Sequence, residues 1–196
     1  MLDRLEPTPR VLALHAHDFE GMFSDLRELG EAIGADPRAL EKSLRRRIET
    51  VTRRARGLRP KRVFCMEWLE PVYTTGHWVP QMVDMVRGRD VLAHPRKNSR
   101  RVEWADVVAA APEALILMPC GLTMERTRKE LPVAARRPEW ARLPAVARGE
   151  VYQVDGPAYF NGAGPRLVDG LEILAEILHP AEFPRRHRRG WTKIGT

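Results

Sequence analysis

The sequence predicts an α/β fold in which a mostly parallel sheet carries helices on both faces. Short apolar runs of the kind found in buried strands alternate with longer segments whose apolar residues recur at helical spacing. The alternation runs from Leu58 to Pro180, with no internal repeat and no low-complexity linker. Strands that alternate with helices favour a parallel sheet, because each crossover helix packs on one face of the sheet.

Three elements are expected before this alternating region. Val11 to Leu14 is a short apolar run and predicts a strand. Apolar residues from Phe19 to Ile33 follow at helical spacing, and the next residue is a glycine suited to a C-cap. A second helix is expected over residues 36–57, with Asp36 as its N-cap and Pro37 in its first turn. At about 20 residues it would be roughly 30 Å long.

The alternating region divides into strands and helices by the period of its apolar residues. The expected strands are Val63 to Met66, Val91 to Ala93, Ala114 to Met118 and Val151 to Val154. The expected helices are Trp78 to Arg87, Trp104 to Ala111, Thr123 to Leu131 and Pro165 to Leu178. Pro80 is compatible with the first of these helices only because it falls in the first turn.

The composition is that of a globular protein. The chain has 196 residues, 43% of them hydrophobic and 30% charged, and no apolar run approaches the roughly 20 residues of a membrane span. As written, the N-terminus has no basic region followed by an apolar core, so no secretory signal peptide is expected and the chain would be cytoplasmic. Cys65 and Cys120 lie in or just after apolar runs, which favours buried reduced thiols over a disulfide framework.

The net charge of +7 is concentrated in two places. Lys42 to Arg62 holds ten basic residues and one acidic residue, and a second basic group lies in the tail from Ala181 to Thr196. Such a distribution is one signature of a nucleic-acid binder. The alternative is a solvated helix face and a disordered end. We favour this alternative and expect no nucleic-acid partner, because no known nucleic-acid motif accompanies the charge and the aromatic residues lie elsewhere.

The most informative segment is Glu67 to Val83, EWLEPVYTTGHWVPQMV. It directly follows the expected strand Val63 to Met66 and precedes a helix, where open α/β sheets place their ligand crevice. Large aromatic side chains beside a few polar groups are typical of small-molecule pockets. The alternative is a loop whose aromatic residues only cover the core.

Four segments carry a resemblance to a known family. They are EWLEPVYTTGHWVPQMV, LILMPCGLTMER from Leu115, WARLPAV from Trp140 and YFNGAGPRLVDGLEILAEILHP from Tyr159. Together they resemble the C-terminal lobe of class III substrate-binding proteins of ABC importers, above all the cobalamin-binding branch. The ligands of this family are cobalamin, siderophores and other metal chelates. The resemblance implies a three-layer Rossmann-like lobe behind a long connecting helix, and a function that is binding rather than catalysis.

The resemblance also divides the chain. Residues 1–35 correspond to a remnant of the N-terminal lobe, 36–57 to the connecting helix, 58–180 to the C-terminal lobe and 181–196 to a basic tail. Family members are extracytoplasmic, carry a signal sequence and bind ligand between two complete lobes, and one wall of that cleft is largely missing here. We therefore expect one of four situations: another polypeptide supplies the missing wall, the chain self-associates as a homodimer or larger through residues 1–34, the family ligand is no longer bound, or the start codon is assigned too far downstream.

The resemblance assigns residues to the ligand cleft. The aromatic candidates are Tyr73, Trp78, Tyr159 and Phe160, whose rings would lie against a corrin; the alternative for each is core packing. Glu67 and Trp68 are placed in the cleft by the end of the first sheet strand. His77 would hydrogen-bond a corrinoid amide or ligate cobalt, and the alternative is a hydrogen bond at a helix start. A soft metal site of Cys65, His77 and Cys120 lacks any zinc-type spacing, so no resident metal and no cofactor are expected.

Further charged residues have a role implied by the resemblance. Glu103 and Asp106 fall in the helix region that would dock on the arginines of an ABC permease, although acids at a helix start also complement the helix dipole. Arg166 at the start of the last helix opposes that dipole and predicts a salt bridge to a neighbouring acid. The sequence has no nucleophile elbow, no HExxH and no phosphate-binding glycine loop, so no enzymatic activity is expected.

Overall fold

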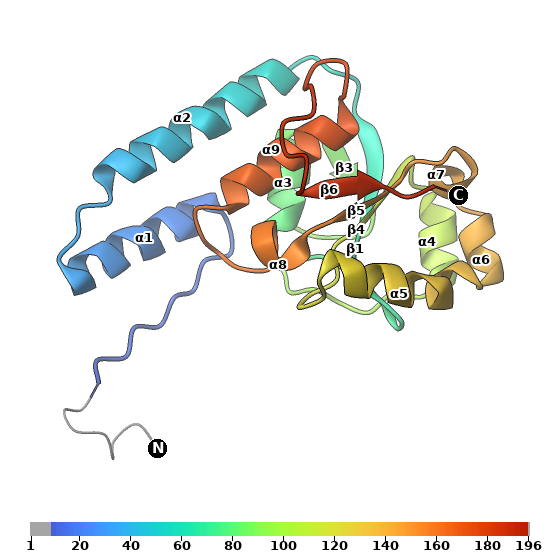
Figure 1. Cartoon of the computed structure of the whole chain (residues 1–196), viewed down its shortest axis with the longest axis horizontal. Coiled ribbons are helices and arrows are strands. Elements are labelled where there is room, and N and C mark those ends of the chain that lie inside the picture. Colours follow the sequence, from blue (N-terminus) through green and yellow to red (C-terminus); the bar gives the residue numbers. More distant parts are fainter. Residues whose placement is uncertain (1–8, 196) are drawn as a thin grey trace.

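The computed structural model, which describes residues 9–195, is built on one six-stranded sheet (Figure 1). The strands are β1 (Lys61–Leu69), β2 (Val72–Thr74), β3 (Gly88–Asp90), β4 (Ala114–Leu117), β5 (Val151–Val154) and β6 (Trp191–Lys193). Their order is β2-β1-β4-β5-β6, and β3 pairs with the first residues of β1. β1 pairs in parallel with β3 and β4, and β4 with β5, while β2 and β6 are antiparallel. The predicted α/β class with a mostly parallel sheet is confirmed.

Nine helices are present among the described residues: α1 (Phe19–Ile33), α2 (Arg38–Ala55), α3 (Val79–Met85), α4 (Trp104–Ala110), α5 (Met124–Ala135), α6 (Pro138–Ala141), α7 (Pro144–Ala147), α8 (Gly156–Tyr159) and α9 (Leu167–Leu178). Figure 1 shows α2 beside α9, at some distance from the sheet. Within residues 9–195, every helix is too short or too polar to cross a membrane.

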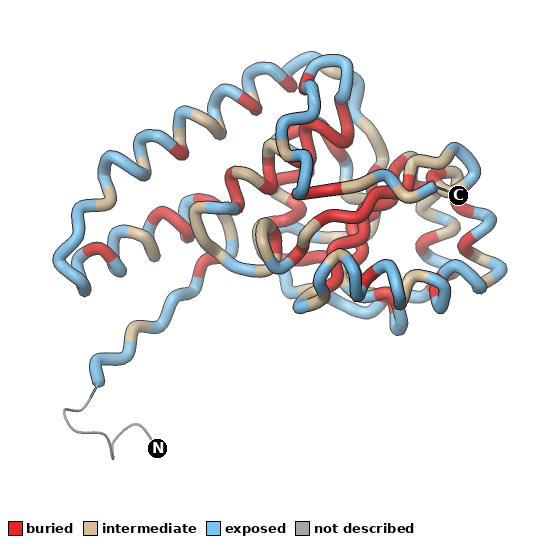
Figure 2. Tube along the Cα trace, viewed as in Figure 1, coloured by how far each residue is buried: buried red, intermediate tan, exposed pale blue. Residues whose placement is uncertain are grey.

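The sheet separates two apolar cores because successive strand residues point to opposite faces. Cys65 and Ile116 face a core completed by α1, α2, α3 and α9, whereas Phe64 and Leu115 face a core completed by α4, α6 and α7. Nearly all of α9 is buried (Figure 2). Gly170 permits this close packing, because a Cβ there would lie 2.6 Å from the Tyr159 carbonyl oxygen.

The two N-terminal helices form as expected. Asp18 caps α1 by accepting a hydrogen bond from the Gly21 N–H at 2.8 Å, and Gly34 closes it in the left-handed conformation. The second helix begins one residue later than predicted, at Arg38, whose N–H donates to the Asp36 carboxylate at 3.0 Å. The apolar face of α1 is divided, since its first turns are buried against the lobe and Ile33 is 68% exposed.

Two expected strands are wrong. Residues 11–14 form no strand, because no neighbouring strand offers them a hydrogen-bonding edge, and both Val11 and Leu14 are exposed. Residues 91–93 are a turn, and the strand lies three residues earlier, at Gly88–Asp90. The turn is fixed by the Asp90 carboxylate, which accepts hydrogen bonds from the N–H groups of Leu92 and Ala93. Strands β2 and β6 and helices α6, α7 and α8 were not expected; each spans only three or four residues.

The C-terminal segment is ordered, which corrects the expectation of a disordered end. Strand β6 pairs with β5, and the Trp191 ring packs edge-on against Tyr152. The buried Glu176 carboxylate on α9 holds the segment in place. It accepts hydrogen bonds from the N–H groups of Arg186 and His187, from His187 Nδ1 and from Trp191 Nε1. The sequence of the tail alone predicts a solvated segment, because the acceptor that holds the tail, Glu176, lies on another element of the chain.

His187 makes the attachment of this segment dependent on pH. Its ring lies 2.8 Å from Glu176 and 3.3 Å from Glu172, and these contacts, with the Glu172 hydrogen bond first, raise its pKa from 6.5 to about 9. Because the folded pKa is the higher one, the stabilisation is complete below pH 6.5 and is lost as the pH rises to about 9. We expect the melting temperature to fall across this window, and the fall to be absent in His187→Asn; equal slopes for the two proteins would contradict the assignment.

Candidate functional site

The candidate site lies at the carboxyl edge of the parallel strands, where the predicted aromatic segment leaves β1. In parallel sheets this edge is shared by all strands, so the loops that follow them meet there. Here they are the β1–β2 hairpin, the loop after β4 and the short helix α8 after β5. Strand β2 leads directly to Gly76 and His77, so the hairpin and the start of α3 are neighbouring parts of one edge.

Trp68 and Tyr73 form a cross-strand pair on the hairpin. They are opposite each other in the register of β1 and β2, so their side chains lie on the same face. Trp68 is 40% exposed and Tyr73 is partly exposed. These two predicted residues therefore present aromatic surface to solvent, as a ligand-stacking face requires.

His77 belongs to a stack of rings at the start of α3. Its imidazole stacks on His17 at 5.3 Å between centroids, with 18° between the planes, and is tilted against the Trp78 ring at 5.5 Å. The backbone of His77 has φ 55° and is held by a hydrogen bond from its N–H to the Lys97 carbonyl at 2.7 Å. His17 could not be identified from the sequence, because no local pattern distinguishes an exposed histidine that lies outside the predicted helices and strands.

Trp78 connects the start of α3 to α8. Its indole Nε1–H donates to the Phe160 carbonyl at 2.8 Å, and the ring packs partly against the core. Phe160 itself is 2% exposed, and its ring lies in the core beside Gly170. The expectation that the Phe160 ring lines the cleft is therefore wrong; its backbone instead fixes the position of Trp78.

Tyr159 remains on the surface and pairs with an arginine. The Arg166 guanidinium lies 4.6 Å from the centre of the Tyr159 ring, which is partly exposed. This cation–π contact takes the place of the salt bridge predicted for Arg166, since no carboxylate within residues 9–195 lies at ion-pair distance from it. The contact adds a positive charge beside the aromatic group at the site edge.

Glu67 supplies the acid of the site. Its carboxylate accepts a hydrogen bond from the Ser99 hydroxyl at 2.6 Å, and its backbone carbonyl accepts one from the Cys120 N–H at 3.0 Å. Partial burial, and then the Glu67 charge, raise the pKa of the Cys120 thiol. The Cys120 thiol is therefore protonated at neutral pH.

The three residues considered for a soft metal site are not brought together. Cys65 is completely buried, and burial, followed by the nearby Asp90, raises the pKa of its thiol. Among the described residues, the one cluster with metal-ligand geometry is Asp169, Glu172 and His187, which includes none of these three residues. Arg47 already pairs with both acids of that cluster, at 2.5 and 2.8 Å.

Asp90 lies beneath the site, at the end of β3. Its carboxylate accepts a hydrogen bond from the Thr75 hydroxyl at 3.3 Å and two more from the turn that follows. Burial raises its pKa to about 7, although these hydrogen bonds oppose the shift. The residue ties β3 and its turn to the segment that carries Gly76.

Glu103 and Asp106, the candidates for permease docking, are exposed at the start of α4. Glu103 is the N-cap residue and lies 3.5 Å from Arg101. Both acids complement the helix dipole, and both remain accessible to a partner.

Comparisons with known proteins agree with this architecture. The sequence model of the family described as "Periplasmic binding protein" matches residues 2–158. A curated relative, the uncharacterized ABC transporter substrate-binding lipoprotein YvrC of Bacillus subtilis (strain 168), is 27% identical over 176 residues, or 86% of this chain and 53% of the relative. The chain thus spans about half the length of the curated relative it matches.

Solved structures share the fold. A periplasmic heme binding protein from Pseudomonas aeruginosa matches with a TM-score of 0.79 and 22% identity, over 100% of this chain and 72% of the other. The periplasmic vitamin B12 binding protein BtuF of Vibrio cholerae matches with a TM-score of 0.69 and 16% identity, over 90% and 68%. With a family match over most of its length, the chain belongs to the periplasmic binding protein family, of the class III type that its sequence segments indicated.

Proposed function

We propose that this chain contributes the ligand-contacting C-terminal lobe of an ABC importer's substrate-binding component. The observation that carries the proposal is the aromatic group at the carboxyl edge of the sheet, which consists of the Trp68–Tyr73 pair and the tilted His77–Trp78 contact. The Trp78 ring is held by its hydrogen bond to a backbone carbonyl, and all four side chains are at least partly exposed, which suits reversible binding of a ligand. The function is binding without chemistry.

The ligand class that fits this surface is a metal chelate with a large flat ring, such as cobalamin. Aromatic side chains stack on such rings, and an imidazole can coordinate the metal at an open axial position. His77 lies within the aromatic group and is partly exposed, so it is the residue we assign to that contact. The proteins with similar structures include ones named for heme and for vitamin B12.

Removing the hairpin pair should weaken this binding. Trp68→Ala and Tyr73→Ala each remove stacking area, so each should weaken cobalamin binding by about 1 to 2 kcal/mol, or roughly tenfold. Val133→Ala, an exposed apolar residue on α5, is the control and should leave affinity unchanged. Calorimetry with cobalamin and cobinamide measures the effect, and equal affinities for all three variants would reject the site.

His77 has a spectroscopic test of its own. If its imidazole coordinates cobalt, His77→Ala should change the visible spectrum of bound cobalamin, whereas His15→Ala, an exposed neighbour of His17, should not. An unchanged spectrum with unchanged affinity would remove His77 from the site.

We also propose that Glu103 and Asp106 form the docking contact with an ABC permease. The support is that both acids are exposed, at the start of a helix on the face of the sheet opposite α9. Exposed charges of this kind contribute mainly to partner selection and association rate.

A second candidate function is association with another protein copy through the N-terminal part. Large apolar side chains are exposed on α1, on α2 and in the extended segment that precedes α1: Val11, Leu14, Leu29, Ile33 and Leu40. Exposed apolar patches mark interfaces, and a homodimer would cover them. The combined change Leu29→Glu and Ile33→Glu should then lower the mass measured by light scattering to that of a monomer. Val133→Glu is the control, and an identical monomeric mass for the wild type would contradict self-association.

The basic helix α2 gives less support to nucleic-acid binding than its sequence indicated. Arg45 is paired with Glu20 and Glu41, and Arg47 with Asp169 and Glu172. These arginines hold the lobe together, so their charge is largely balanced within the chain.

A further inference from the structure

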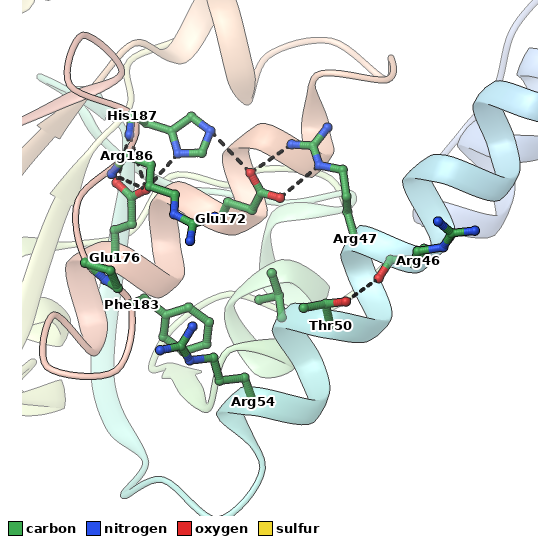
Figure 3. Close-up of a pocket in the computed structure, with 11 residues that line it drawn as sticks. Arg46, Arg47, Thr50, Arg54, Glu172, Glu176, Phe183, Arg186 and His187 are labelled. Atoms are coloured by element: carbon green, nitrogen blue, oxygen red, sulfur yellow. Dashed lines mark hydrogen bonds and ion pairs between the residues drawn. The ribbon is translucent and has the colours of Figure 1, made fainter.

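A cavity of about 250 Å³ lies between α2, α9 and the C-terminal segment, and its lining includes none of the candidate aromatic residues (Figure 3). Its apolar lining includes Val51 of α2 and the buried Phe183. Arginines from two elements reach it, and two glutamates of α9 form part of its wall. The balance of these charges decides what the cavity can hold.

Both carboxylates in the wall are already neutralised. Glu172 accepts hydrogen bonds from the Arg47 guanidinium at 2.9 and 2.8 Å and lies 3.3 Å from His187 Nε2. Burial opposes its ionisation, but the hydrogen bonds from His187 and Arg47 outweigh burial and lower its pKa to about 2. Glu176 is occupied by the donors that hold the C-terminal segment. Neither acid has an uncompensated charge to offer a cation.

Two guanidinium groups at the cavity have no such compensation. Arg54 projects from α2 to lie over the Phe183 ring, 5.1 Å from its centre, and the Arg186 side chain points into the cavity from the C-terminal segment (Figure 3). Within residues 9–195, no carboxylate lies at ion-pair distance from either guanidinium. Arg46 also borders the cavity, but its side chain points away from it (Figure 3). The cavity therefore carries an excess of positive charge.

We propose that this cavity is a binding site for a phosphate group, held between Arg54 and Arg186 over the apolar floor. Planar guanidinium groups bind phosphate oxygens in pairs of parallel hydrogen bonds, and two of them on different elements fix its orientation. His187, protonated by its contacts with Glu172 and Glu176, adds positive charge at the wall. The floor of Val51 and Phe183 suits the carbon atoms of a phosphate ester, which a bare phosphate lacks. The same chemistry is offered by a small phosphate ester and by a phospholipid head group.

The test uses inorganic phosphate and glycerol 3-phosphate as probes, titrated by calorimetry at constant ionic strength. The double variant Arg54→Gln/Arg186→Gln should weaken binding of both probes by at least about tenfold, because each of its two substitutions removes charge-assisted hydrogen bonds. Arg56→Gln/Arg189→Gln removes the same charge from the same two parts of the chain but outside the cavity, and it should leave the affinity unchanged. Equal losses in the two double variants would show that the probes bind diffuse surface charge, and this would overturn the site. A wild type that binds neither probe would overturn it as well.

Vesicles distinguish the two sources of phosphate. Sedimentation with phosphatidylglycerol vesicles that depends on Arg54 and Arg186, but not on Arg56 and Arg189, assigns the cavity to a lipid head group. Binding of glycerol 3-phosphate without such sedimentation assigns it to a soluble phosphate ester. The cobalamin titrations test Trp68, Tyr73 and His77, which do not line this cavity. Failure of this proposal therefore leaves the proposed function untouched, and the reverse also holds.

Discussion

Replacing Glu176 with alanine is expected to lower the free energy of unfolding by about 3 to 5 kcal/mol, the range for removing one partner of a buried charged network. The carboxylate is buried on α9 and accepts hydrogen bonds from two backbone N–H groups, one imidazole and one indole. Alanine would leave those donors unpaired and the protonated His187 without one of its two acids. Strand β6 should detach with them, since its Trp191 is one of the donors.

Chemical denaturation measures this loss, and proteolysis of the C-terminal segment reports the detachment. Glu176→Gln keeps one acceptor oxygen and should recover part of the stability. Glu182→Ala changes an exposed acid of the same segment and should stay within about 0.5 kcal/mol of the wild type. A loss below about 1 kcal/mol for Glu176→Ala would mean that water satisfies the donors and that the segment is held by other contacts.

The second large effect is expected from Gly76→Ala, which should disable the candidate site. A Cβ at Gly76 would lie 2.4 Å from the Lys97 carbonyl oxygen and from the Ser99 N–H nitrogen. Both are backbone atoms, so the segment 97–99 must move. That movement breaks the hydrogen bond from the His77 N–H to the Lys97 carbonyl, and the one from Ser99 to Glu67.

We expect Gly76→Ala to cost about 1 to 3 kcal/mol of stability, as overpacking does, and to weaken chelate binding by more than tenfold. Gly162→Ala is the matched control, because a Cβ there meets no atom within 4 Å. Binding by Gly76→Ala at wild-type affinity would show that the His77 and Glu67 geometry does not matter to the ligand. The two variants are compared by thermal melting and calorimetry.

The sequence predicted the long elements well, because their signals are local. Helix α1 has an aspartate cap, a glycine stop and helical apolar spacing, and each feature is readable without tertiary contacts. Strands β1, β4 and β5 are buried on both faces of the sheet, and the continuous apolar runs in their sequences predict such strands. The run at residues 11–14 has the same composition but no strand to pair with, and pairing partners are not visible in a local window.

The sequence predicted which segment forms the candidate site, but not the contacts between its side chains. Residues 67–78 form the end of β1 and the segment that follows it, so Trp68, Tyr73, His77 and Trp78 lie at the carboxyl edge of the sheet, as their position in the sequence predicts. Burial of Phe160 could not be inferred, because it depends on the close approach of α9 that Gly170 allows. The pairing of His17 with His77 joins residues 60 positions apart, and the role of Glu176 depends on a segment that folds back from the end of the chain. Such contacts are set by topology.

The most direct test of the central claim is a map of amide chemical shifts on addition of cobalamin at millimolar concentration. We predict that the perturbed residues lie along 67–78, at His17 and around Tyr159, whereas α2 is unaffected. Perturbation confined to α2 and the C-terminal segment, or none at all, would contradict the assignment of this edge of the sheet as the ligand-binding surface.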